Sequence, residues 1–272
     1  RVLMDIGGGD AGPGALQPTW EMDFDSWPPS DVEPTAFYLG PDGALTNDAP
    51  TADGEDEYTP DTSARNPTSL PEGDAWAAQP PYEWQPVMAN DGLGYVTEPL
   101  TDDLTIAGPA SMDLFLKSSA ADTDLQVTLS EVRPDGKESY VQFGVLRASY
   151  RAPDKDSNDL EVVPTYLKAD RAELPADEFT LVRVPIFPVA YVFRAGSRLR
   201  VTIQAPGGER PSWMFDTKED GSTTNTISRS PALASRLMLP VLPGRTADLP
   251  LPACGAPRGQ PCRMYVAAGN GG

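Results

Sequence analysis

The chain has 272 residues, a formal net charge of −19, two cysteines and no histidine. The missing histidine excludes Ser-His-Asp and Cys-His catalytic sites, because both need an imidazole that exchanges a proton near neutral pH. It also excludes zinc sites built on histidine, and two cysteines are too few for a cysteine cluster. We therefore expect no catalytic residues, no metal and no cofactor in this chain. The length suffices to bury the core of one large β domain or two small ones.

The negative charge is concentrated in residues 1–100, which hold 19 acidic residues but only two bases, Arg1 and Arg65. Such a field repels nucleic-acid phosphates and anionic lipids, and no segment approaches the ~20 apolar residues of a membrane span. We expect neither nucleic acid nor membrane as a partner. The acidic part is interpreted as a solvated surface. Adaptation to salt and a face turned toward a basic neighbouring domain remain alternatives. No signal peptide is visible, which suggests a mature or truncated fragment.

The first 92 residues are rich in turns. Short strands are expected at Val2–Ile6 and Thr35–Leu39. The acidic, proline-rich stretch 48–83 has no apolar period, and we interpret it as a long loop ordered by the aromatic residues Trp76, Tyr82 and Trp84. The run DGEDE at 53–57 could bind Ca²⁺, but it lacks the full set of ligand positions of an EF-hand loop. A solvated charge run is therefore the favoured interpretation.

From residue 93 onward, apolar and polar residues alternate. The apolar members are Met112, Leu114 and Leu116, then Leu125, Val127 and Leu129, then Leu199, Val201 and Ile203. This period predicts antiparallel strands with one buried and one wet face. The sequence RPDG at 133–136 predicts a turn between two strands, with Gly136 free to take positive φ. Further strands are expected at 139–150, 179–187 and 233–239. The pattern predicts an all-β sandwich of two sheets, most simply a jelly roll.

Asp122 and Asp124 flank Thr123, and as paired carboxylates they could act as acid and base. We favour a structural interpretation, in which aspartates cap main-chain amides where a strand begins. Arg147 and Arg151 are expected to pair with such acids.

Cys254 and Cys262 lie eight residues apart in a turn-rich tail, a separation that allows a disulfide and predicts an oxidising compartment outside the cytoplasm. Five tryptophans suggest sugar stacking, although packing under loops is the more common role of tryptophan. Trp213 is the better candidate for an exposed, ligand-stacking position. A free-standing carbohydrate-binding module is therefore the alternative function.

Five segments in order resemble the C-terminal domain of the CocE/NonD hydrolases, the family of X-Pro dipeptidyl-peptidases and cocaine esterase. In chain order they are Trp27-Pro28-Pro29 with Tyr38-Leu39 and Asp42–Leu45, then Glu98–Pro109, then 122–151, then 193–201, then 235–241. The segment 122–151, with its "V.PDG" turn and the run Gly144-Val-Leu-Arg-Ala, is the most specific. In the fourth segment Ser197 stands where the family usually has histidine.

The resemblance implies a single galactose-binding-like jelly roll over 1–272, with a loop-rich first segment (1–92), main strands (93–245) and a disulfide-bearing tail (246–272). It implies a non-catalytic domain of a secreted serine hydrolase, an esterase or dipeptidyl-peptidase, whose catalytic triad lies upstream in an α/β-hydrolase domain. That domain is the expected partner, and the parent's substrate is expected to be a small acyl compound or peptide. An early loop, roughly 58–84, is expected to reach the active-site mouth, so Trp76, Tyr82 and Trp84 are candidate substrate-pocket residues.

Overall fold

The computed structural model describes residues 2–6, 18–60, 84–207, 221–247, 250–255 and 260–268. In these ranges the regular structure is β-strand apart from short 3-10 turns at Pro41–Gly43, Ala148–Tyr150 and Lys168–Asp170. The described part of the chain contains no helix long and apolar enough to cross a bilayer.

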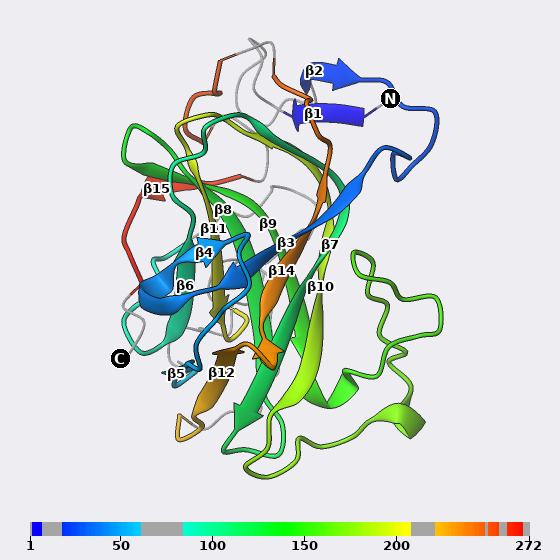
Figure 1. The fold of residues 1–272 in the computed structure, drawn as a ribbon, viewed down its shortest axis with the longest axis vertical. Coiled ribbons are helices and arrows are strands. Elements are labelled where there is room, and N and C mark those ends of the chain that lie inside the picture. Colours follow the sequence, from blue (N-terminus) through cyan, green and yellow to red (C-terminus); the bar gives the residue numbers. More distant parts are fainter. Residues whose placement is uncertain are drawn as a thin grey trace, which may run out of the picture.

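The strands form two large sheets and a separate N-terminal hairpin, and every strand pair is antiparallel. Their bounds are β1 (Val2–Ile6), β2 (Pro18–Met22), β3 (Glu33–Leu39), β4 (Leu45–Thr46), β5 (Glu55–Tyr58), β6 (Gly92–Val96), β7 (Leu104–Ser118), β8 (Asp124–Val132), β9 (Lys137–Arg147), β10 (Thr180–Phe193), β11 (Arg198–Gln204), β12 (Asn225–Ser230), β13 (Leu233–Ala234), β14 (Arg236–Val241) and β15 (Cys262–Met264). The hairpin β1–β2 lies at the top of the molecule in Figure 1.

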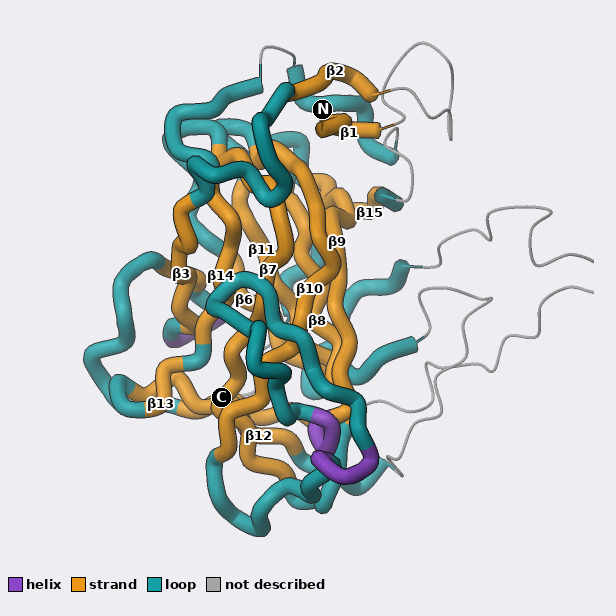
Figure 2. The backbone as a smooth tube through the Cα atoms, turned by 90° about the vertical axis from the view of Figure 1, so that its right-hand side faces the viewer, coloured by secondary structure: helices purple, strands orange, loops and turns teal. Residues whose placement is uncertain are grey.

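The larger sheet has eight strands in the order β13-β12-β7-β14-β3-β4, with β10 also paired to β7 and β5 to β12. The smaller sheet has five, in the order β15-β9-β8-β11-β6. Figure 2 shows β3 and β14 on one side of the sandwich and β8 and β9 on the other. Strands from the first segment and from the tail thus join the same two sheets as the central strands.

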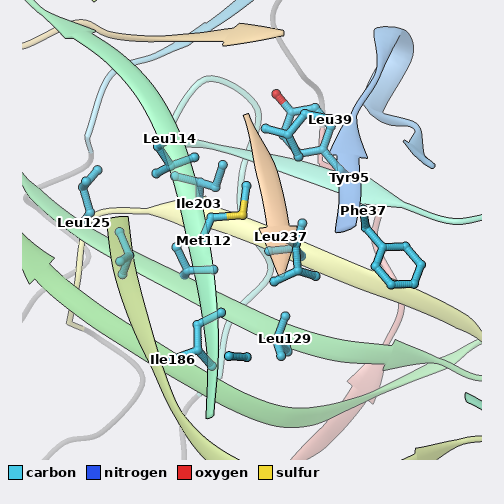
Figure 3. Packing of buried hydrophobic residues seen from close by; sticks show 14 of the residues in the cluster. Phe37, Leu39, Tyr95, Met112, Leu114, Leu125, Leu129, Ile186, Ile203 and Leu237 are labelled. Atoms are coloured by element: carbon cyan, nitrogen blue, oxygen red, sulfur yellow. The ribbon is translucent and has the colours of Figure 1, made fainter. Parts of the chain in front are cut away.

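The core lies between the two sheets, where the inward side chains of β7, β10 and β14 meet those of β8, β9 and β11. Met112, Leu114, Leu125 and Leu129 are fully buried there, and Figure 3 shows them packed with Ile186, Ile203 and Leu237. Because each strand contributes every second residue to this layer, the alternation in the sequence is sufficient to define it. The predicted all-β, jelly-roll type of sandwich is confirmed.

Most predicted strands are confirmed, with small shifts at their ends. The turn at 133–136 joins β8 to β9, and Gly136 has a φ of +79° as expected. The strand expected at 179–187 continues to Phe193 because a bulge between Ile186 and Val189 restores its register with β7.

The expectation of a solvent-exposed outward face is wrong for β8 and β11. All nine residues of β8 are buried, and so are Leu199–Ile203 of β11. The tail 260–268 packs on the two strands that flank β8: Arg263 binds Glu138 of β9, and the Tyr265 ring lies under the guanidinium of Arg200 of β11. In the run at 53–57, Asp53, Glu55 and Glu57 are exposed as expected, but the run is not simply part of a long loop. Its last three residues lie in β5, which pairs with β12, and Asp56 is buried. Acidic residues are depleted in strands, so no local pattern predicts β5.

Candidate functional site

The candidate pocket residues lie mostly outside the described part of the chain. Trp76 and Tyr82 fall in 61–83, and Trp213 falls in 208–220. Trp84 is described and buried. Its ring packs edge-on against Tyr140 at 5.2 Å, and the guanidinium of Arg263 lies 3.7 Å from its centre. Trp84, the last residue of the candidate pocket loop 58–84, is therefore packed on the five-stranded sheet.

Cys254 and Cys262 form the predicted disulfide, with their Cα atoms 5.5 Å apart. Cys262 begins β15 and pairs with Ser139 of β9. The bridge thus closes a loop within the tail, and the pairing of β15 with β9 attaches that loop to the edge of the smaller sheet.

A carboxylate between two arginines lies under this tail. Glu138 accepts bonds from Arg200 Nη1 at 2.7 Å and from Arg263 Nη2 at 3.0 Å, and the Ser130 hydroxyl donates to it at 2.6 Å. A side chain at Gly94 would crowd Arg200, because a Cβ there would lie 3.1 Å from its Nη2. Each oxygen of this carboxylate is occupied by a donor, which makes Glu138 a structural anchor and leaves it poorly suited to proton transfer.

The larger sheet carries a similar arrangement on its own outer face. Asp113 of β7 binds Arg183 of β10 at 2.8 Å and Arg236 of β14 at 3.1 Å, across its two neighbouring strands. Burial alone would lower the pKa of the Arg236 guanidinium, but its bonds to Asp113 and Tyr38 raise it. This cluster ties three strands together.

Two further buried acids bind tyrosines. The hydroxyl of Tyr95 donates to Asp56 at 2.6 Å, and Arg229 donates to the same oxygen at 2.9 Å. Desolvation first, then the negative charge of Asp56, raises the pKa of Tyr95 well above its ordinary value. Tyr95 therefore stays a neutral donor at physiological pH.

Glu131 at the end of β8 connects the two sheets. It accepts a bond from the Tyr191 hydroxyl at 2.5 Å and one from the main-chain N–H of Arg194 at 3.1 Å. Desolvation raises the pKa of Glu131, although hydrogen bonds from Tyr191, Ser197 and Arg194 lower it in part. Ser197, which stands where the resemblance expects histidine, is buried beside this carboxylate.

The structural interpretation is confirmed for Asp122, which accepts main-chain N–H bonds from Thr123 and Ser149. Asp124 binds Arg147 through both carboxylate oxygens, which is the pairing expected for Arg147. These bonds occupy the two carboxylates in holding the start of β8 to the end of β9.

The pairing expected for Arg151 is wrong. Its guanidinium donates to the carbonyls of Ala148, Ala172 and Glu173, and Arg171 is the residue that pairs with Asp122, at 3.5 Å. The sequence could not distinguish these arginines because the loop after β9 folds back over 20 residues. Among the described residues, no group of three or more acids, cysteines or histidines could hold a metal ion.

One cavity of about 230 Å³ opens on the surface beside the bulge of β10. Its walls come from β7, β9, β10 and the loop after β9, and are mostly apolar, with Glu161 among the lining residues. The lining residues are Pro109, Ala110, Val145, Glu161, Val162, Val163, Tyr166, Pro185, Ile186, Phe187 and Pro188. Phe187, Tyr166 and Val163 are exposed, as is Leu167 next to them. Sequence reasoning missed this site, since its residues are distant in the chain and follow no motif.

Residues 3–238 match the family described as the X-Pro dipeptidyl-peptidase C-terminal non-catalytic domain. The chain belongs to this family. The resemblance noted in the sequence is thereby confirmed, and the domain is the non-catalytic C-terminal part of hydrolases of the dipeptidyl-peptidase and CocE type.

Relatives by sequence are hydrolases much longer than this chain. A Mycobacterium bovis protein that carries the provisional name of a serine esterase is 30% identical over 228 residues, which are 80% of this chain and 35% of that protein. The cocaine esterase of a Rhodococcus species is 28% identical over 247 residues, which are 82% of this chain and 40% of the esterase. The chain thus spans little more than a third of the length of the relatives it matches.

Solved structures share the fold. A CocE/NonD family hydrolase from Staphylococcus aureus superposes with a TM-score of 0.63 at 16% identity, over 81% of this chain and 38% of that chain. An α-amino acid ester hydrolase superposes with a TM-score of 0.57 at 24% identity, over 76% of this chain and 36% of its own. At such identities the likeness establishes the architecture of the domain.

Proposed function

We propose that this domain completes a serine hydrolase that acts on small esters or peptides, in which it stabilises the α/β-hydrolase domain and forms one wall of the substrate pocket. The observation that carries the proposal is the family match over residues 3–238, joined with relatives named as esterases that are well over twice as long. The galactose-binding-like subclass of the fold belongs to the same proposal. So does secretion, which the disulfide supports because such bridges persist in oxidising compartments.

The charge pairs support a role without chemistry. Glu138, Asp113, Asp56 and Asp124 each bind arginine, and Glu131 binds a tyrosine. A general base must reach the substrate's proton, whereas these carboxylates are buried and bonded within the fold. We therefore expect the 272-residue chain alone to leave p-nitrophenyl esters and X-Pro anilides unhydrolysed. A rate above buffer that a serine-directed fluorophosphonate abolishes would contradict this.

The pocket wall is tested in the full-length hydrolase with Trp76→Ala. We expect KM to rise by the equivalent of about 1–3 kcal/mol, the usual effect of losing an aromatic contact, while kcat stays within about tenfold. Trp27→Ala is the matched control, since Trp27 is exposed and lies outside the loop 58–84. An equal KM for Trp76→Ala and the parent enzyme, with normal folding, defeats the pocket role. A thousandfold loss of kcat would instead reveal a catalytic role.

A further inference from the structure

We propose that the cavity beside the β10 bulge is a preformed socket for the catalytic domain of the same protein, which inserts one apolar side chain from a positively charged surface. The inference rests on the proposed function and names the contact through which the two domains are joined.

Two separate backbone irregularities turn aromatic side chains toward the cavity mouth. Phe187 lies in the register shift of β10, and bulges typically re-aim a side chain, which here is 52% exposed. Tyr166 has a φ of +51°, which is uncommon for a bulky residue, and its side chain is 60% exposed. Strain of this kind persists where the surroundings enforce it and clusters at binding sites. The loop that carries Tyr166 projects at the lower right of Figure 1.

The walls of the cavity are closely packed. A Cβ at Gly144 of β9 would collide with the carbonyl oxygen of Pro185, so the glycine permits a close approach of the two strands at this point. Phe187 packs edge-on against Phe143 at 5.2 Å, and three prolines line the opening. A volume of about 230 Å³ is below the roughly 300–1,000 Å³ of drug-sized ligand pockets. The size therefore suits a single apolar side chain.

The charge around the cavity indicates the nature of the partner. Asp156, Asp159 and Glu161 are exposed on the loop beside it, where the exposed bases include Lys155, which lies 3.5 Å from Asp156, and Lys168. A second copy of this chain would bring the same acidic rim and a net charge of −19, so self-association is opposed. Complementarity requires lysine or arginine around an apolar group. Exposed apolar patches rimmed by polar residues mark interaction sites. The segments that could bind here include the remainder of the parent protein, because 60% or more of each relative's length lies outside this domain.

A photo-crosslinker tests the occupant directly. We would replace Tyr166 by benzoylphenylalanine in the full-length hydrolase, irradiate it, and map the crosslinked peptides by mass spectrometry. We expect an intramolecular crosslink to the catalytic domain, at an apolar residue near lysine or arginine. The matched control is the same replacement at Met264, which is exposed on β15 at the edge of the other sheet and should give no such crosslink.

A second variant tests the charge. Glu161→Lys should reduce the crosslinking yield from position 166 at least about threefold at low salt, because it places like charges at the rim, whereas Glu161→Asp should preserve it. Since Glu161 is exposed, neither change should unfold the domain. Equal yields for the two variants would overturn the charge complementarity.

The outcomes separate the socket from the proposed function. A crosslink to a second copy, or none at all in an active and folded enzyme, overturns the socket. If deleting the whole domain leaves the stability and KM of the hydrolase unchanged, the proposed function fails even where the crosslink forms. If the deletion impairs both while position 166 forms no crosslink, the domain has its role and the socket is elsewhere.

Discussion

The two sheets each carry a carboxylate held between two arginines on the outer face, but they shield it differently. Glu138 in the smaller sheet lies beneath the disulfide-bound tail, whereas Asp113 in the larger sheet has its arginines at the surface. The exposed side-chain fractions are 0%, 1% and 11% for Glu138, Arg200 and Arg263, and 6%, 18% and 31% for Asp113, Arg183 and Arg236. Loss of the carboxylate should therefore destabilise the fold more at Glu138 than at Asp113. An arginine left unpaired costs far less free energy where it can reach water than where it cannot.

The largest expected effect comes from breaking the covered cluster. Glu138→Ala leaves Arg200 and Arg263 without their shared anion, and Arg200 has almost no access to water. We expect the free energy of unfolding to fall by about 3–5 kcal/mol, measured by denaturant titration. A loss below about 1 kcal/mol would mean that the tail moves aside and lets water in.

Removing the disulfide should have the next largest effect. The double substitution Cys254→Ser and Cys262→Ser opens a loop whose ends are eight residues apart in the sequence. The chain-entropy model assigns about 2.5 kcal/mol of stability to the closure of such a loop. Hydrogen exchange should quicken at Glu138 and Ser139 of β9, which pair with β15, and not at the Ser111–Asp113 stretch of β7. If hydrogen exchange quickened equally in both sheets, the disulfide would support the whole fold and not only the attachment of the tail.

Asp113→Ala breaks the open cluster, and its cost should be smaller. Arg183 and Arg236 can turn toward water, so we expect a loss of about 1–3 kcal/mol in the same titration. A loss equal to that of Glu138→Ala would remove the difference between the two sheets.

Glu131, which lies between the two sheets, should make the stability of the fold depend on pH. Its pKa is raised in the fold, so the folded state keeps the proton to higher pH than the unfolded chain does. Stability should accordingly fall as pH rises from about 4.5, the ordinary value, to the raised pKa, and then level off. Each unit of difference corresponds to about 1.4 kcal/mol. Glu131→Gln should lack this fall, as seen by thermal unfolding between pH 4 and 7. Parallel curves for the two proteins would contradict the shift.

The smallest effect is expected at the surface pair of Arg245 and Asp31, which are both about half exposed. Asp31→Asn should change the free energy of unfolding by less than about 1 kcal/mol, and added salt should abolish the change. A larger effect would show that surface charge pairs matter more here than exposure indicates.

The strands that could be predicted from the sequence are those in which apolar and polar residues alternate. Strands β7, β8 and β11 alternate strictly, and the sequence located them because each buries every second residue in one core. β5 and β15 carry no such signal, since Asp56 binds Tyr95 and Arg229, and Arg263 binds Glu138, partners that are 39 or more residues away along the chain. Of the proposed site residues, the sequence found the disulfide by spacing, and Trp84 as an ordering residue by its aromatic character.

The inner layer of the sandwich, the turn at Gly136, the family and the absence of an imidazole could all be predicted from the amino-acid sequence. Each depends on residue type and short spacing, which are read along the chain. The tertiary structure alone decided that the outer face of β8 is covered, that Arg171 and not Arg151 meets Asp122, and that Phe187 and Tyr166 border one cavity. These outcomes depend on which distant segments cross a sheet. That choice is made by packing and by the high cost of leaving buried charges such as Glu138 unpaired.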